Sequence, residues 1–322
     1  MIIHTMNPTA LPVATQPLQA GVAAVPHLGV IRARGADAAS FLHGQLTQDF
    51  LLMKPNEARL AAFCSAKGRM QASCVAVKRT APDGDTEILL IGSRDMLAAT
   101  LKRLSMFVLR AKVKLTDASD EFALCGLSGN AITSIAEEPR SAWACDHFDQ
   151  MVLITLYPAD GMARALWVAP AGTPLPAGPV LDSASWRWGE VRSGIADITG
   201  PIVDAFVPQM LNYESVGGVN FKKGCYPGQE VVARSQFRGT LKRRGYLVHA
   251  DSAMTAGQEV FGAGDDTQPC GMVAQAAAAP DGGFDAIVSM QVAAAQAGGL
   301  TLAGGAAQLE LLPLPYPLLA DI

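Results

Sequence analysis

The order in which strand-like and helix-like segments alternate near the start of this chain constrains its fold most. Residues 28–34 (LGVIRAR) have the composition of a strand, and residues 35–50 place Ala38, Phe41 and Leu42 at helical spacing. Residues 58–79 predict a hairpin, because two β-type runs flank a Ser-Ala-Lys-Gly-Arg turn.

A second run of strand, helix and strands follows the hairpin. Residues 87–92 predict a short strand, and Ser93 is a candidate N-cap for a helix whose leucines share one face. Further strands are predicted at 108–116 and 121–128. This β-α-β-β-α-β order is typical of an α+β layer, with helices on one face of an antiparallel sheet.

Two changes in composition divide the remainder of the chain. A segment rich in proline and glycine (APAGTPLPAGP) predicts a connector, and a helix is expected at 183–194 beyond it. After residue 241, short β-type runs alternate with turns, which predicts a small β-barrel or sandwich of about six strands. We expect a loose tail at 1–27, a region 28–240 with a connector near 169–182, and a β-barrel at 241–322.

The cysteine pattern and the uncharged start favour a cytoplasmic protein. None of the six cysteines forms a C-x-x-C pair or has histidine at zinc-ligand spacing, so free thiols and no permanent metal are expected. The start lacks a basic segment and is interrupted by prolines, and no apolar run is long enough to cross a bilayer. The net charge of −4 gives no whole-protein case for nucleic acid.

The segment FKKGCYPGQEVVAR (221–234) places Cys225 between two lysines and a Pro-Gly turn that opens a predicted helix at Gln229. Cations and helix N-terminal N–H groups both favour the thiolate over the thiol. This arrangement suits a nucleophile, a redox thiol or a transient metal ligand. The alternative is a buried cysteine that packs as a small hydrophobic residue.

Positive charge is concentrated around this motif. Residues 222–244 hold seven basic residues, including Lys222, Arg234 and Arg238, against the single acid Glu230. Such a patch attracts a phosphate, a polyglutamate tail or RNA, although it is equally consistent with a solvated rim. Stacking aromatics are sparse here, which favours a small anion over RNA.

The helix predicted at 183–194 carries one tryptophan away from its apolar stripe. At 100° per residue, Trp188 and Val191 share the stripe, whereas Trp186 lies nearly opposite. An aromatic ring facing away from the core is free to stack on a flat ligand. The alternative is that Trp186 packs against a neighbouring domain.

The motif resembles the K-G-C-Y-x-G-Q-E signature of the YgfZ family, folate-binding proteins linked to iron–sulfur enzymes and tRNA modification. The segments GADAASFLHGQLTQD, CSAKGRM, GIADITGPIVDAFVPQMLN and LELLPLPYPL resemble other family segments, in family order. The resemblance implies a fold similar to the glycine-cleavage T-protein: two α+β lobes around a central folate hole, plus a C-terminal β-barrel. The signature then falls on Lys223, Gly224, Cys225, Tyr226, Gly228, Gln229 and Glu230.

The resemblance also assigns a folate site, with departures from the T-protein pattern. Trp186 matches a tryptophan that contacts folate, Arg192 replaces a pterin-holding glutamate, and Leu28 replaces a second tryptophan. The strand around Ser73 lacks the carboxylate pair of the T-protein, which disfavours a stand-alone aminomethyltransferase. A pterin would then be held differently, or by another acid such as Glu190.

Three functions follow as hypotheses. The first is a folate-binding accessory protein that uses Cys225 to maintain or repair iron–sulfur enzymes, such as those that methylthiolate tRNA. The second is a tetrahydrofolate-dependent aminomethyl or one-carbon transferase. The third is a non-enzymatic module in which the basic segment makes a tRNA contact.

Overall fold

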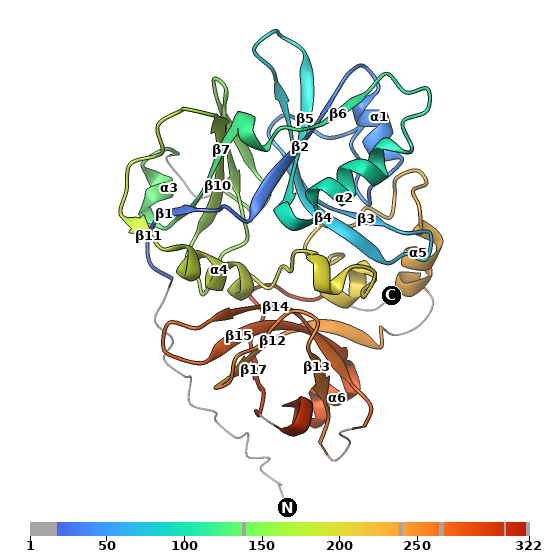
Figure 1. The fold of residues 1–322 in the computed structure, drawn as a ribbon, viewed down its shortest axis with the longest axis vertical. Coiled ribbons are helices and arrows are strands. Elements are labelled where there is room, and N and C mark those ends of the chain that lie inside the picture. Colours follow the sequence, from blue (N-terminus) through green and yellow to red (C-terminus); the bar gives the residue numbers. More distant parts are fainter. Residues whose placement is uncertain (1–17, 137–139, 238–240, 264–266, 306, 320–322) are drawn as a thin grey trace, which may run out of the picture.

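The computed structural model describes residues 18–136, 140–237, 241–263, 267–305 and 307–319. Two lobes lie side by side, and a C-terminal sheet lies below both of them (Figure 1). The α+β class predicted from the order of elements is therefore confirmed.

The first lobe is an antiparallel five-stranded sheet with the order β3-β4-β5-β2-β6. The predicted hairpin is present, and its two strands pair in register from Ala58–Val77 to Ala62–Ser73. Ser93 occupies the N-cap position of α2 as predicted, but its hydroxyl donates to Asp95 and makes no capping hydrogen bond to the helix backbone. The elements are β2 (Leu28–Arg34), α1 (Ala38–His43), β3 (Ala58–Cys64), β4 (Met70–Thr80), β5 (Thr86–Ser93), α2 (Arg94–Ser105) and β6 (Lys114–Asp117).

The second lobe is a six-stranded sheet with the order β11-β1-β7-β10-β9-β8. Its strands are antiparallel except for the β1–β11 pair, which is parallel. The elements are β1 (Gly21–Ala24), β7 (Phe122–Ser128), α3 (Asn130–Thr133), β8 (Cys145–Phe148), β9 (Met151–Thr155), β10 (Arg164–Pro170) and β11 (Val180–Leu181), and a 3₁₀ turn (Ser119–Glu121) precedes β7.

Strand β1 corrects two of the expected boundaries. The predicted loose tail ends earlier than residue 27, because β1 pairs with β7 and β11 and Leu18 is buried beside them. Residues 1–17 lie outside the described residues. The connector predicted near 169–182 begins within β10 and ends in β11, so it forms an edge of the second sheet. Edge pairing satisfies backbone groups that a free linker would leave to water.

Helix α4 (Ser183–Arg192) joins the lobes to the C-terminal sheet. The Asp182 carboxylate accepts from Ser185 N at 2.8 Å and caps the helix, and Gly194 follows its end at a φ of +70°. Two 3₁₀ turns (Gly200–Ile202 and Pro208–Leu211) and α5 (Gln229–Phe237) follow. Helix α5 begins at Gln229, as the Pro-Gly turn predicts.

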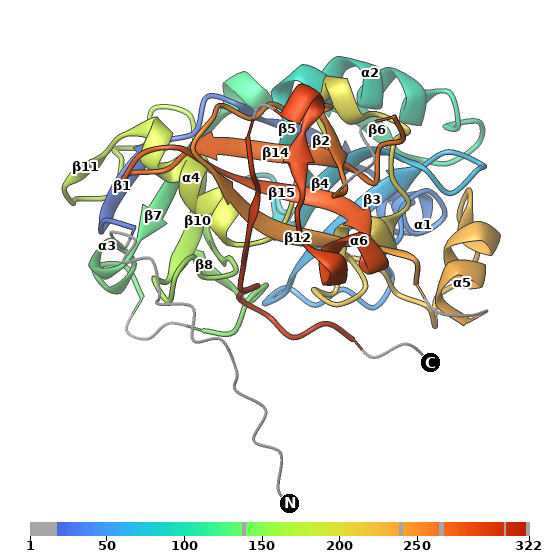
Figure 2. The ribbon, with the colours of Figure 1, turned by 90° about the horizontal axis from the view of Figure 1, so that it is seen from below.

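The C-terminal part is a curled, half-barrel sheet of six strands with the order β16-β13-β14-β15-β12-β17. Its central strands cross beneath the lobes, as seen from below in Figure 2. The elements are β12 (Arg243–Ala250), β13 (Glu259–Phe261), β14 (Gly271–Ala278), β15 (Phe284–Gln291), α6 (Val292–Ala297), β16 (Thr301–Leu302), a 3₁₀ turn (Ala303–Gly305) and β17 (Glu310–Leu312).

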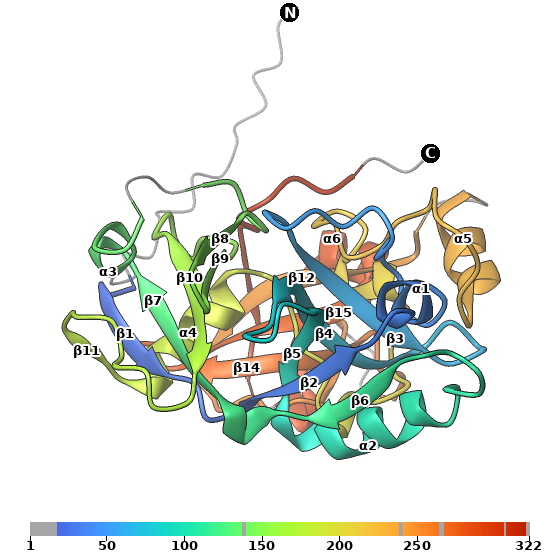
Figure 3. The ribbon, with the colours of Figure 1, turned by 90° about the horizontal axis from the view of Figure 1, so that it is seen from above.

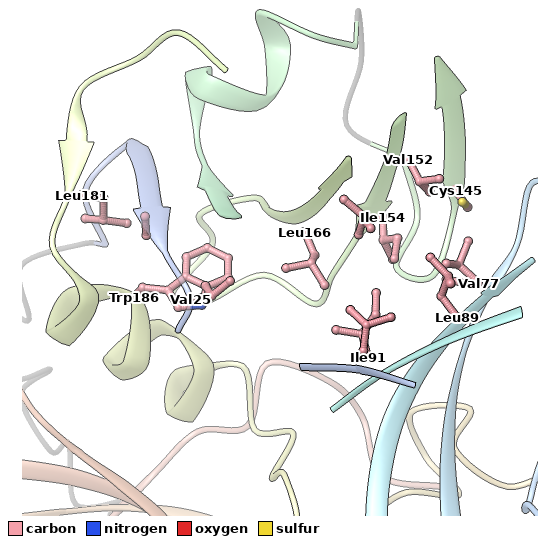
Figure 4. Packing of buried hydrophobic residues seen from close by; sticks show 14 of the residues in the cluster. Val25, Val77, Leu89, Ile91, Cys145, Val152, Ile154, Leu166, Leu181 and Trp186 are labelled. Atoms are coloured by element: carbon pink, nitrogen blue, oxygen red, sulfur yellow. The ribbon is translucent and has the colours of Figure 1, made fainter. Parts of the chain in front are cut away.

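The two lobes share one hydrophobic core. Val77 and Leu89 of the first sheet face Val152 and Ile154 of the second, and α4 adds Trp186 (Figure 4). Each fully buried side chain of this kind stabilises the fold by roughly 1.5–3 kcal/mol. The lobes are therefore fixed against each other by a continuous apolar interior.

Candidate functional site

The cysteine motif forms a loop in front of α5, and Cys225 is exposed on it. Gly228 takes a φ of +79° and packs against the hairpin turn of the first lobe. A Cβ at Gly228 would lie 2.3 Å from Ser65 O and 2.6 Å from the Gly68 Cα. Only glycine fits this position, because it needs both a left-handed backbone and close approach to another chain segment.

Lys223 is buried beneath this loop. Its Nζ donates to the carbonyls of His43 and Leu46, the latter at 2.8 Å, and lies 4.6 Å from the centre of the Tyr226 ring. Burial lowers the pKa of Lys223 to about 8, although the charges of Asp49 and Cys225 act in the other direction and raise it. The lysine therefore anchors the motif to the end of α1.

The rest of the signature lies at the surface or only partly covered. Gly224 and Glu230 are exposed, whereas Gln229 is partly buried and its side chain donates to Lys223 O at 3.5 Å. Tyr226 is buried and packs inward. The motif thus has an inner anchoring side and an outer side that carries Cys225.

The other cysteines differ from Cys225 in their surroundings. Burial raises the pKa values of the Cys64, Cys74, Cys125 and Cys145 thiols to about 12, and it also raises the pKa of Cys270. Of the six thiols, Cys225 is the exposed one. The alternative that it packs as a buried hydrophobic residue is wrong.

A cavity lies between the lobes above α4, with about 590 Å³ of empty space including its open mouth. Leu28, Ile91 and Leu166 form part of its apolar wall, and Figure 4 shows Ile91 and Leu166 converging from the two sheets. Its polar lining comes from Arg164, Trp186, Glu190, Ser193 and Asp197. Leu28 and Trp186 are thus placed together, as the resemblance implies.

Trp186 lines the cavity but offers no free ring face. It is 1% exposed, and a Cβ at Gly126 would lie 2.5 Å from its ring. The Arg164 guanidinium covers the ring, 4.3 Å from its centroid. The expectation that Trp186 faces away from the core is therefore wrong, since α4 is covered by the second lobe and the C-terminal sheet.

Glu190 provides an ionised acceptor in the cavity. Its Oε1 accepts from Trp186 Nε1 at 2.8 Å and lies 2.9 Å from His27 Nε2. Burial opposes ionisation, but His27, Arg164 and Arg187 outweigh it and hold the pKa of Glu190 below its ordinary value. Glu190 Oε2, which lies 3.7 Å from Arg187 Nη1, and Arg164 Nε are buried without a hydrogen-bond partner among the described residues. One carboxylate oxygen and one guanidinium N–H of the lining residues are thus left without a hydrogen bond.

Asp197 is a cavity acid that sequence reasoning missed. Residues following α4 bring its carboxylate within 3.4 Å of Ser73 Oγ, and Ser73 Oγ accepts from Ile198 N at 2.9 Å. Burial, and then the charge of Glu190, raises the pKa of Asp197 to about 6. Asp197 therefore places an acid beside Ser73 on β4, the strand that lacks the carboxylate pair of the T-protein. No local sequence signal connects Ser73 and Asp197, which are far apart in the chain.

Arg192 does not line the cavity. Its Nε lies 2.9 Å from Asp160 Oδ1, and its Nη1 lies 3.4 Å from Asp285 Oδ2 on β15. This side chain pairs with Asp160, which lies between β9 and β10 of the second lobe, and with Asp285 of the C-terminal sheet. The assignment of Arg192 to the cofactor site is therefore corrected to a structural ion-pair cluster.

The basic segment is less of a patch than its composition predicts. Lys222 and Arg234 are exposed, but Lys223 is buried, and Arg244 donates to Glu214 at 2.8 Å. Arg238 lies outside the described residues. The free positive charge near Cys225 therefore comes from a subset of the seven basic residues.

The structure separates Cys225 from the cavity. Cys225 is not among the cavity-lining residues, and α4 and α5 lie apart in the views from the front and from above (Figures 1 and 3). The thiol therefore does not lie in the wall of the cavity between the lobes. The β3–β4 hairpin connects the two places, because Leu60 and Val75 line the cavity and the turn packs against Gly228.

Two lobes around a cavity, with a half-barrel below, define the aminomethyltransferase T-protein fold class. The structure is similar to the crystal structure of the glycine cleavage system aminomethyltransferase T from Bartonella henselae, with a TM-score of 0.64. The match covers 92% of this chain and 87% of that one at 17% identity, so it shows the fold.

Curated relatives make the identification more specific. The tRNA-modifying protein YgfZ of Edwardsiella ictaluri is 30% identical over 320 residues, with 89% of each chain covered. That of Cronobacter sakazakii is 30% identical, and that of Yersinia pseudotuberculosis is 29% identical over the full length of both chains. The chain belongs to the YgfZ family. No protein-family model matches the sequence.

Membrane-spanning helices and metal-binding side-chain clusters are both absent from the described residues. No helix within them is long and apolar enough to span a membrane. No group of three or more histidine, cysteine, aspartate or glutamate side chains in the described part is arranged to hold a metal ion.

Proposed function

We propose that this chain is a cytoplasmic, folate-binding accessory protein of tRNA modification that maintains or repairs iron–sulfur enzymes. Its proposed clients include enzymes that methylthiolate tRNA. The name of its relatives, tRNA-modifying protein, supports the link to tRNA. The observation that carries the proposal is Cys225, an exposed thiol on an anchored loop, which can engage a cluster, a sulfur species or a disulfide.

The cavity residues fit a tetrahydrofolate. A pterin ring presents N–H donors, and Oε2 of the ionised Glu190, which accepts no hydrogen bond from the described residues, is a matching acceptor. Arg164 contributes a buried cation with an unpaired donor, which suits a carbonyl or carboxylate oxygen. A bound tetrahydrofolate would carry a one-carbon unit on its ring nitrogens.

The thiol role is tested by complementation. In a strain that lacks this protein, wild type and Cys74→Ser are expected to restore tRNA methylthiolation, whereas Cys225→Ser is not. Cys74 is the matched control because burial raises the pKa of its thiol to about 12. Mass spectrometry of tRNA nucleosides gives the readout, and full restoration by Cys225→Ser would refute the thiol role.

Folate binding is tested by titrating purified protein with tetrahydrofolate and following tryptophan fluorescence. Glu190→Gln is expected to weaken binding by at least about tenfold, since a charged acceptor is lost from a buried site. Asp204→Asn is the control, because this residue lies outside the cavity lining. Truncation of Trp186 is a poor test, because removing a buried tryptophan costs about 3–5 kcal/mol. Equal affinities of wild type and Glu190→Gln would remove Glu190 from the site.

One observation favours a second function, a tetrahydrofolate-dependent aminomethyl or one-carbon transferase. Asp197 supplies an acid at the cavity wall, and its pKa of about 6 suits proton transfer near neutral pH. Turnover of methylene-tetrahydrofolate by wild type, lost in Asp197→Asn, would establish this activity. Tight binding without turnover favours the accessory role.

A weak tRNA contact is part of the proposal. Lys222 on the motif loop and Arg234 on α5 are exposed. Charge reversal of both is expected to abolish tRNA binding at low salt and to leave tetrahydrofolate binding unchanged. Wild-type protein without measurable tRNA affinity at low salt would exclude the contact.

A further inference from the structure

The loop that carries Cys225 lies directly against the end of α1. Lys223 donates to the carbonyls of His43 and Leu46, which lie at and just after the end of α1. Gly224 leaves room for the histidine ring, because a Cβ there would lie 3.3 Å from His43 Nε2. The outer edge of the imidazole thus faces the backbone next to Cys225.

Asp49 fixes the proton on the other side of this ring. His43 Nδ1 lies 3.1 Å from Asp49 Oδ1, which also accepts from Leu51 N and Leu52 N at 3.0 Å each. Burial opposes ionisation, but the Leu52 N–H and His43 outweigh it and hold the pKa of Asp49 below its ordinary value. An ionised carboxylate only accepts hydrogen bonds, so Nδ1 of the neutral ring carries the proton. Nε2 then presents a lone pair toward Gly224.

The thiol is carried one residue away from the glycine beside that lone pair. Consecutive Cα atoms are about 3.8 Å apart, so the Cys225 Cα lies one short step from Gly224, where a Cβ would lie 3.3 Å from His43 Nε2. Cys225 is exposed, so its side chain can rotate between staggered positions without displacing core atoms. Rotation toward Nε2 would give the nucleophile, base and orienting carboxylate of a thiol–imidazole–carboxylate site.

We propose that His43, oriented by Asp49, is the base that takes the proton of the Cys225 thiol and makes Cys225 a nucleophile toward disulfides. The inference rests on the proposed role of Cys225. The Sγ–H bond breaks as Nε2 gains the proton, and the thiolate attacks one sulfur of the disulfide. A mixed disulfide forms, and the released sulfur leaves as a thiolate that takes the proton back from the imidazolium. No external oxidant or reductant enters this exchange.

The closing experiment measures disulfide exchange by the full-length protein. The probe is an aromatic disulfide that releases a coloured thiolate, and peptide mapping assigns the modified cysteine. At about pH 7, His43→Gln is expected to react at least about tenfold more slowly than wild type, and Asp49→Asn to fall between them. His147→Gln is the matched control, because His147 contacts Pro55 O and buried Cys145, away from the motif.

The pH profile separates a base from a merely structural residue. The charged groups facing His43 and Asp49 are Lys223, Cys225 and Arg59, whose Nη1 donates to Asp49 O at 2.5 Å. With His43 as the base, the rate profile of His43→Gln shifts by more than about one unit to higher pH. An unchanged rate and profile in His43→Gln, or modification of a cysteine other than Cys225, would overturn the inference. If Cys225→Ser still abolishes complementation in that case, the proposed function stands and the base alone is refuted.

Discussion

Replacement of Asp197 by asparagine is expected to stabilise the protein at neutral pH. The folded state raises the pKa of this carboxyl from 3.8 to about 6, chiefly through burial and then through Glu190. A shift of about two units corresponds to at most about 3 kcal/mol of unfolding free energy. Because the folded state holds this proton more tightly, Asp197 destabilises the fold as pH rises from about 4 through 6. Asparagine has nearly the same side-chain shape as aspartate but carries no charge.

Urea unfolding at two pH values measures this effect. Near pH 7.5 the free energy of unfolding of Asp197→Asn should exceed that of wild type by about 2–3 kcal/mol, and near pH 3.5 the two should agree. Asp204→Asn is the control, since the Asp204 carboxylate accepts from Gln71 at an exposed position and no stabilisation is expected. If Asp197→Asn is no more stable than wild type near pH 7.5, the argument that ionisation of Asp197 lowers the free energy of unfolding is refuted.

Three further predictions concern stability, each measured by urea unfolding or by the melting temperature. Gly126→Ala should cost about 1–3 kcal/mol, because the new Cβ would overlap the α4 tryptophan ring, whereas Gly262→Ala, with open space around it, should be neutral. Arg192→Met should cost about 3 kcal/mol, since it removes the arginine that pairs with both Asp160 and the buried Asp285; a neutral result would show that these ion pairs do not stabilise the fold. Lys223→Met should cost about 1–3 kcal/mol by unpairing two carbonyls. It should also remove the rise in wild-type stability from about pH 8 to 10.5 that a lowered lysine pKa produces.

Local signals in the sequence predicted local structure well. The hairpin of β3 and β4 follows from a glycine turn between two β-type runs, and α5 starts where a Pro-Gly turn ends. The half-barrel follows from short strands at regular spacing, and the α+β class from the order of elements. In each case the deciding interaction joins residues that are close in the chain.

Contacts between distant segments were not predictable in the same way. Strand β1 looks like part of a tail, because its pairing partners β7 and β11 lie about 100 or more residues away. The helical periodicity of α4 gave a wrong prediction for Trp186. Periodicity assumes a helix with one buried side, whereas α4 is buried on both sides. Arg192 was assigned to the cavity and Asp197 was missed for a similar reason, because the partners of each are fixed by packing between elements.

The separation of Cys225 from the cavity changes what a folate could do in this protein. A folate bound there has no direct contact with the thiol through the cavity wall, so a transfer from folate to sulfur at one centre is not supported. What the two places share is the β3–β4 hairpin, whose strands carry Leu60 and Val75 to the cavity and whose turn supports Gly228. The strands of this hairpin are paired along their length and have contacts at both ends, and coupling between sites can travel through such a contiguous element. Under the proposed function, a folate in the cavity would act on the position of the cysteine loop, whereas His43 and Asp49 would act on the chemistry of its thiol.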